Sequence, residues 1–149
     1  MLAPDVSVSF ANSGLTSALG RSLTFDLRAD GYARAESSGV VIMDRAREHR
    51  ASVELMRGSV VRQEGRTATL TAPSSQAQRA MIVAALADAL LGSAQVDCVE
   101  AAANGSYMGD TMEAGAVSRA LLGGPRYRVL ALQGVKANMG HPELSLIHI

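Results

Sequence analysis

Residues 128–141 read Arg128-Val-Leu-Ala-Leu-Gln-Gly-Val-Lys-Ala-Asn-Met-Gly-His141, and this stretch decides the fold. Its apolar part, residues 129–132, is too short for a globular helix and predicts a buried strand. Lys136 and His141 follow at once, among residues that favour turns. Ligands of open α/β sheets bind at the carboxyl ends of the strands, where such side chains can stabilise a developing negative charge. The alternative at this point is an ordinary loop histidine beside a solvated lysine.

The composition excludes several classes of protein. The chain has 149 residues and 48% of them are hydrophobic, which is enough for one sizeable core. Its 14 basic and 14 acidic residues cancel, so we expect neither a nucleic acid nor an acidic membrane surface as a partner. No apolar run approaches the roughly eighteen residues of a membrane span, and no signal-peptide pattern opens the chain. With one cysteine, this composition favours a reducing, cytoplasmic location.

Apolar periodicity predicts alternating strands and helices. We expect strands over residues 39–43, 53–61, 96–101 and 129–132, and a brief alternating segment over residues 6–10 also has the strand pattern. Helices are expected from near Ser74 to Leu91 and from Asp110 to about Leu122. Ser75 with Gln78 fits a capping box, and Gly92 fits a C-terminal cap. The negative charges of Asp110 and Glu113 suit the start of the second helix. Because strand, helix, strand, helix, strand is the order of a βαβ layer, the expected fold class is α/β with a parallel sheet.

Several motifs in matching order carry a resemblance to a known family. They are Phe25-Asp-Leu-Arg-Ala-Asp-Gly-Tyr-Ala-Arg-Ala-Glu36, Arg57-Gly-Ser-Val-Val-Arg-Gln-Glu-Gly-Arg66, Leu70-Thr-Ala-Pro73, Gly109-Asp-Thr-Met-Glu113 and Gly134-Val-Lys-Ala-Asn-Met-Gly-His141. In these motifs the chain resembles the C-terminal portion of a β-ketoacyl synthase. The resemblance is strongest to the ketosynthase domains of modular polyketide synthases, and it covers residues 1–143 almost without gaps.

This resemblance implies a partial thiolase-like fold with αβαβα layers. Residues 1 to about 50 would end its first half, residues 51–143 would begin its second, and residues 144–149 look like a non-native tail. The implied reaction is the decarboxylative condensation of acyl and malonyl thioesters in polyketide or fatty acid biosynthesis. The implied partners are an acyl carrier protein that presents substrates on 4′-phosphopantetheine, the neighbouring synthase domains, and a second copy of the domain in a homodimer. No bound cofactor and no metal is expected.

The resemblance also assigns roles to individual residues. His141 occupies the position of the family's second catalytic histidine, and Lys136 that of its lysine. Asp110 and Glu113 match its acidic pair, and we expect Glu113 to form an ion pair with Lys136. The family's two imidazoles donate hydrogen bonds to the thioester oxygen as the enolate develops. The loop of the first histidine places Ala102 at that position, and a methyl group can neither donate a hydrogen bond nor carry a proton.

Two departures from the family keep a second function open. The family's nucleophilic cysteine would lie upstream of residue 1, and Cys98 does not replace it, since we expect a buried, inert thiol inside a strand. The main interpretation is a fragment of a condensing ketosynthase. The alternative is a non-elongating ketosynthase, which binds or transfers acyl chains without condensing them because Ala102 replaces the first histidine. Nucleotide binding is a weaker hypothesis, since no glycine-rich phosphate loop follows any predicted strand.

Overall fold

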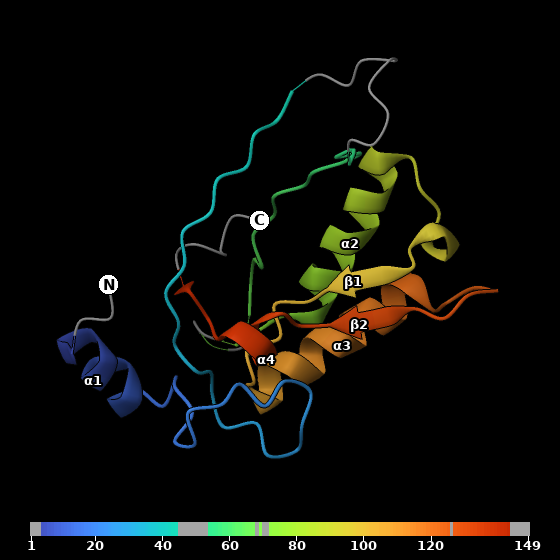
Figure 1. Ribbon diagram of the computed structural model, residues 1–149. Helices are drawn as coiled ribbons and strands as arrows, with labels where there is room; N and C mark the ends of the chain where they lie inside the picture. Colours follow the sequence, from blue (N-terminus) through green and yellow to red (C-terminus); the bar gives the residue numbers. More distant parts are fainter. Residues whose placement is uncertain (1–3, 45–53, 68, 70–71, 126, 144–149) are drawn as a thin grey trace.

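The computed structural model describes residues 4–44, 54–67, 69, 72–125 and 127–143. Their elements are, in chain order, α1 (Pro4–Asn12), α2 (Ser75–Ala89), a 3-10 turn (Ser93–Gln95), β1 (Cys98–Glu100), α3 (Tyr107–Leu121), β2 (Ala131–Gln133) and α4 (Lys136–Met139). Figure 1 shows α2, α3, β1 and β2 gathered into one body, with α1 at the edge of the molecule. The suspected tail, residues 144–149, lies outside the described residues.

A parallel βαβ unit forms the centre of this body. β1 and β2 pair in parallel with Val99 opposite Leu132, and α3 connects them. This confirms the predicted strand–helix–strand order over this part of the chain. The prediction of a buried strand over residues 129–132 is wrong, since β2 begins at Ala131, Val129 is 89% exposed, and no further described strand covers the sheet. α2 lies against α3, and the buried apolar residues gather around these elements: Ala89, Ala101, Ala103, Ala116, Val117 and Leu121. The core is small, since Leu121 is the one large side chain among the described residues with less than 2% of its surface exposed.

Both long helices form where the sequence predicts them, but their ends differ. Ser74, rather than Ser75, caps α2, and its side chain accepts a hydrogen bond from the backbone nitrogen of Ala77 at 3.2 Å. The helix ends at Leu90 in the left-handed conformation (φ 56°), two residues before the predicted cap Gly92. Gly92 instead opens the 3-10 turn, where its nitrogen donates to the side chain of Gln95. Helix ends depend on which side chain captures the free backbone groups, so a shift of one or two residues is expected.

α3 begins three residues earlier than predicted. Ser106 caps it, with its hydroxyl 3.5 Å from the backbone nitrogen of Gly109, and the helix starts at Tyr107. Asp110 therefore lies in the first turn instead of opening the helix. This position is still favourable for a negative charge, because the free amide groups of the helix start point toward it.

Three predicted strands do not form. Residues 6–10 lie within α1, which Pro4 opens and whose first turn contains Asp5. Residues 39–43 are extended but unpaired, with Val40 and Ile42 about nine-tenths exposed. The described part of the third segment, residues 54–61, also lacks regular structure. An apolar run becomes a strand only when a neighbouring strand takes up its backbone hydrogen bonds, and no such neighbour faces these runs in the described part of the chain.

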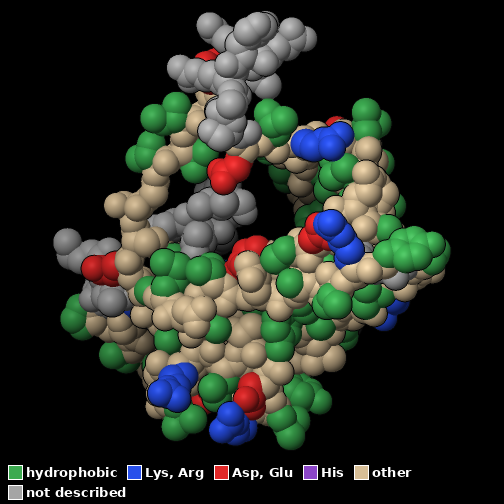
Figure 2. All heavy atoms as spheres, turned by 45° about the vertical axis from the view of Figure 1, so that its right-hand side comes forward, with side chains coloured by type: hydrophobic (Ala, Val, Ile, Leu, Met, Phe, Trp, Pro, Cys, Tyr) green, Lys and Arg blue, Asp and Glu red, His purple; other side chains and the backbone are tan. Residues whose placement is uncertain are grey.

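The uncovered apolar residues are visible on the surface. In Figure 2 apolar side chains are scattered over the visible face of the molecule, which agrees with the many large apolar residues that are exposed. The extended chain after residue 36 stands away from the body and leaves an open gap beside it.

Among the described residues, no helix combines the length and apolarity that crossing a membrane requires.

Residues 15–36 wrap around one end of the βαβ unit. Isolated bridges join Thr16 to Tyr32, Asp30 to Ser106 and Arg34 to His141. These contacts bring the motif that begins at Phe25 next to the start of α3 and next to the loop after β2. The segments that contain the predicted site residues therefore meet at the carboxyl ends of β1 and β2.

Candidate active site

His141 is buried at the end of the loop that follows β2. Its backbone nitrogen donates to the carbonyl of Ala33 at 2.7 Å, and its own carbonyl accepts from Ala35 at 3.0 Å. The side chain is 9% exposed, and the ring of Tyr32 lies 4.7 Å from the imidazole, centroid to centroid. Backbone pairing therefore fixes where His141 sits, and packing fixes its ring.

One hydrogen bond sets the tautomer of this imidazole. The backbone nitrogen of Glu143 donates to Nδ1 of His141 at 2.8 Å, so in the neutral ring the proton is on Nε2. Burial, and then the positive charge of Lys136, lower the pKa of His141 below its usual value. Nε2 has no partner among the described residues, and it is not among their fully buried unpaired atoms. His141 therefore presents a neutral imidazole with an accessible N–H donor.

Lys136 begins α4, and its ammonium group points back toward the loop after β1. Its Nζ donates to Oδ1 of Asn104 at 3.0 Å. Burial lowers the pKa of Lys136, while the charges of Glu113 and Glu100 act in the opposite direction. Burial outweighs the two carboxylates, so the pKa of Lys136 lies below its usual value.

The expected ion pair between Glu113 and Lys136 is not formed. No contact within 4.0 Å joins the two side chains, and the carboxylate instead accepts from the backbone nitrogens of Ala102 at 2.7 Å and Ala103 at 2.9 Å. Glu113 lies on α3 and reaches the turn after β1, where these two amides have no strand to bond with. Backbone amides therefore take both carboxylate oxygens, and Lys136 interacts with this charge only at longer range.

The turn after β1 is fixed from several sides. Ala103 is fully buried in a left-handed conformation (φ 42°), and its carbonyl accepts from the hydroxyl of Thr24 at 2.8 Å. A Cβ on Gly134 would lie 2.6 Å from that of Ala103, so glycine is needed there for the two loops to approach. Gly105 accepts from the nitrogen of Gly31 at 2.9 Å. Ala102, for which the sequence predicted the position of the family's first histidine, is exposed on this turn.

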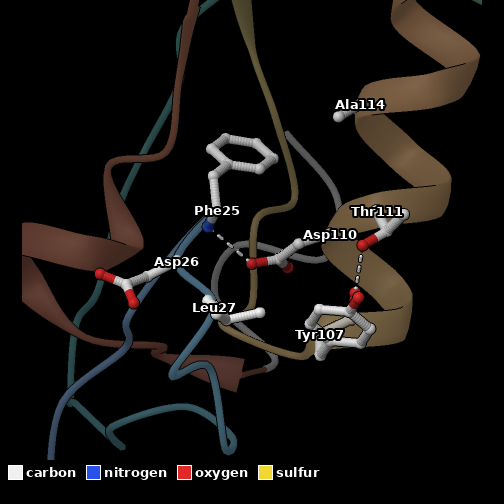
Figure 3. A pocket seen from close by; sticks show the side chains of 7 residues that line it. All are labelled: Phe25, Asp26, Leu27, Tyr107, Asp110, Thr111 and Ala114. Atoms are coloured by element: carbon white, nitrogen blue, oxygen red, sulfur yellow. Dashed lines mark hydrogen bonds between the residues drawn. The ribbon is translucent and has the colours of Figure 1, made fainter.

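Asp110 has a separate role from Glu113. It is 3% exposed, and its Oδ2 accepts from the backbone nitrogen of Phe25 at 2.9 Å. Phe25 is in the left-handed region (φ 56°), which side chains rarely adopt, so this hydrogen bond holds a strained turn. Figure 3 shows the carboxylate of Asp110 reaching from α3 to this turn, beside Leu27 and Tyr107. The pocket there, about 340 Å³, is lined mainly by apolar surface and does not include His141 or Lys136.

Cys98 is exposed, so the prediction of a buried thiol is wrong. It shares one face of β1 with Glu100, and nothing in the described part of the chain covers that face. The prediction assumed that neighbouring elements would cover both faces of the strand, and the described elements leave this face open. No group of three or more potential metal-binding side chains occurs among the described residues.

The sequence did not reveal two of the contacts that organise the site. Arg34 binds Glu143 with two nitrogens, at 2.6 and 3.2 Å, and Glu143 is the residue whose amide sets the tautomer of His141. Asn104 holds the amine of Lys136. Arg34 and Glu143 are 109 positions apart, so no local spacing could have linked them.

Together, Asn104, Lys136 and His141 form a cluster of hydrogen-bond donors at the carboxyl ends of β1 and β2. The cluster contains a neutral imidazole N–H, an ammonium group and a side-chain amide. All three are attached to backbone that other segments of the chain hold in place. Such fixed donors stabilise an oxygen on which negative charge develops during a reaction.

Comparison with known proteins identifies the family of the chain. The model of the β-ketoacyl synthase N-terminal domain matches residues 1–49, and that of the β-ketoacyl synthase C-terminal domain matches residues 54–146. A phenolphthiocerol/phthiocerol polyketide synthase of Mycobacterium tuberculosis is 35% identical over 147 residues, which is 96% of this chain. The highly reducing polyketide synthase azaB of Aspergillus niger is 39% identical over 149 residues.

Among solved structures, the ketosynthase from module 6 of the bacillaene synthase of Bacillus subtilis superposes on 95% of this chain with a TM-score of 0.74 and 22% identity. The chain corresponds to 27% of that structure. It spans 7% of the mycobacterial synthase and 6% of the fungal one. The fold is thus the α/β, thiolase-like fold of ketosynthases, present here in part. The chain belongs to the β-ketoacyl synthase family, as part of a ketosynthase domain of the polyketide synthase type.

Proposed function

We propose that this chain supplies part of the active site of a ketosynthase domain that condenses acyl and malonyl thioesters in polyketide biosynthesis. The observation that carries the proposal is the state of His141, a buried and neutral imidazole that keeps its proton on Nε2 and whose pKa is lowered by burial and by the charge of Lys136. A thioester oxygen that becomes an enolate oxygen needs such a donor. Fatty acid synthesis uses the same condensation chemistry, and it is the second pathway in which such a domain could act.

The chemistry assigns each group a task. In the malonyl thioester, the bond between the α-carbon and the carboxylate breaks, carbon dioxide leaves, and the electron pair moves into an enolate. His141 donates a hydrogen bond to the enolate oxygen, and the charge of Lys136 favours the same anion. The enolate carbon then attacks the acyl thioester on the family's cysteine, whose thiolate leaves. Glu113 and Asp110 keep the surrounding loops in place.

The proposed partners follow from this chemistry. An acyl carrier protein would present both thioesters on 4′-phosphopantetheine, and neighbouring synthase domains would supply and accept the chain. A homodimer of the intact domain is part of the same proposal. We also keep the division into the end of one half near residue 50 and the start of the next, with residues 144–149 as a tail outside the native domain.

A second candidate function is favoured by Ala102. The exposed methyl group stands where the family has its first histidine, so one of two imidazole donors is absent. Loss of one such donor typically slows a reaction by about a hundredfold to a thousandfold. A domain with this alanine would accept acyl groups from the carrier but would extend them slowly or not at all.

The test separates acyl loading from chain extension in the complete ketosynthase domain that contains this chain. Mass spectrometry would follow acylation of the domain from a carrier-bound acyl thioester, and then extension with a malonyl carrier. We expect loading at a normal rate, slow extension, and a further loss of extension by roughly a hundredfold or more in His141→Phe, with loading unchanged. Ala102→His should raise extension, within the limits set by the altered neighbours Ala103 and Tyr107.

Each other outcome has a definite meaning. A domain that loads but never extends, with or without Ala102→His, would support the non-elongating alternative. A domain that is not acylated at all would contradict the proposed function. An unchanged extension rate in His141→Phe would remove His141 from the mechanism.

A further inference from the structure

One end of the side-chain amide of Asn104 is fixed by a hydrogen bond, and the other end has no partner among the described residues. Its Oδ1 accepts from the ammonium group of Lys136 at 3.0 Å, and since a lysine only donates, this contact fixes which end of the amide is oxygen. Its Nδ2 has no partner among the described residues and is not among their fully buried unpaired atoms. The side chain is partly buried, so the amide presents two N–H donors at an accessible surface beside Lys136.

The backbone on both sides of Asn104 is held rigidly. Before it, Ala103 donates to Glu113 at 2.9 Å and accepts from Thr24 at 2.8 Å. After it, Gly105 is buried, and its carbonyl accepts from Gly31 at 2.9 Å. A donor on such a support needs no reorganisation during a reaction, which is the condition under which a hydrogen bond to a developing oxyanion is most effective.

The place of this amide is significant because Ala102, two residues earlier on the same turn, offers no donor. Lys136 lies between the two halves of the site, in contact with Asn104 and close enough to His141 to lower its pKa. Asn104 and His141 are therefore both linked to Lys136, Asn104 by a hydrogen bond and His141 through the charge that lowers its pKa.

We propose that Asn104 is a catalytic residue, whose side-chain amide donates a hydrogen bond to the thioester oxygen in place of the histidine that is absent at position 102. This inference rests on the proposed function and adds a specific donor to it. The slow decarboxylation of a malonyl thioester by this domain then depends on two donors, His141 and Asn104. In the absence of an acyl group, the malonyl thioester loses carbon dioxide and the enolate carbon takes a proton from water, which leaves an acetyl thioester.

The experiment measures this decarboxylation in the complete ketosynthase domain, with malonyl carrier as the substrate and acetyl carrier as the product. Asn104→Leu keeps the size of the side chain and removes both donors, while Asn104→Asp keeps the acceptor for Lys136 and removes the donors. We expect both variants to lower kcat by roughly a hundredfold with little change in KM. Acyl loading should not change. The control Asn12→Leu alters an exposed asparagine at the end of α1 and should leave both rates unchanged.

A double-mutant cycle distinguishes catalysis from a structural role. With Ala102→His present, an imidazole again offers a donor, so Asn104→Leu should cost far less than it does beside Ala102. A variant that merely damages the turn would lose the same factor in both backgrounds, and this outcome would overturn the inference.

Other results also decide the question. A rise in KM alone would show that Asn104 binds the substrate in its ground state, and so would contradict a catalytic role. An unaltered domain that loads acyl groups but does not decarboxylate would overturn the role of Asn104 and leave acyl binding intact. A domain that is not acylated at all would instead contradict the proposed function itself.

Discussion

Two apolar runs of this chain, residues 39–43 and residues 129–132, look alike in the sequence and differ in the structure. The second leads into β2, which pairs with β1 and places Lys136 and His141 at the carboxyl end of the sheet. The first stays unpaired, with its large side chains 71% to 91% exposed. Both runs have the composition of a strand. The difference teaches that an apolar run forms a strand only when a second strand takes up its backbone hydrogen bonds. Of these two runs, only the second has such a partner, because β1 pairs with residues 131–133.

The largest expected effect compares one truncated side chain in each region. Leu121→Ala removes the largest fully buried side chain around α3 and should lower the free energy of unfolding by about 2–5 kcal/mol. Ile42→Ala removes a side chain that is 91% exposed and should change it by less than about 0.5 kcal/mol. Urea unfolding followed by circular dichroism at a helix band measures both. Equal losses would show that the extended run packs in solution.

The next effect concerns the carboxylate that holds the turn after β1. Glu113→Gln replaces one of two acceptors with a donor that faces an amide, and leaves one of the two backbone nitrogens, of Ala102 or Ala103, without its acceptor. We expect a loss of about 1–3 kcal/mol in the free energy of unfolding. Glu64→Gln is the matched control, because Glu64 also accepts from a backbone nitrogen, that of Ser74, but at an exposed site. The same denaturation curves apply, and a loss in the control as large as that in Glu113→Gln would contradict the importance of burial.

The smallest effect is the pH dependence that His141 contributes. Burial lowers the pKa of His141 in the folded chain, so the unfolded chain, with a pKa near 6.5, binds protons more strongly. The free energy of unfolding should therefore fall as the pH drops below about 6.5, and the fall should end once the pH passes the folded pKa. Nitrogen-15 NMR of the imidazole should report the Nε2–H tautomer above that pKa. His141→Phe should flatten this part of the curve of unfolding free energy against pH. A pKa of His141 above 6.5 in the folded chain would contradict the claim that burial lowers it.

Much of the central unit could be predicted from the sequence, because its information is local. Apolar periodicity and polar caps locate α2 and α3 to within a few residues, and two short apolar runs locate β1 and β2. The motif that ends at His141 also placed Lys136 and His141 after the second of these strands, although Lys136 begins the short helix α4 and does not lie in a loop. Each of these inferences uses residues that lie within about one helix length of one another, and the βαβ order then brings the loops to one edge.

Only the tertiary structure decided which hydrogen-bond partners the side chains of the site have and which tautomer His141 adopts. The sequence suggested that Glu113 would pair with Lys136, but in the fold the free amides of Ala102 and Ala103 take the carboxylate, and Asn104 takes the amine. The tautomer of His141 depends on Glu143, which Arg34 holds from a position 109 residues away. The physical reason is that hydrogen-bonding groups compete for partners once burial has removed water, and the outcome depends on which distant segments meet there. Periodicity and spacing determine the elements of this protein, while the contacts between those elements determine which donors the site presents.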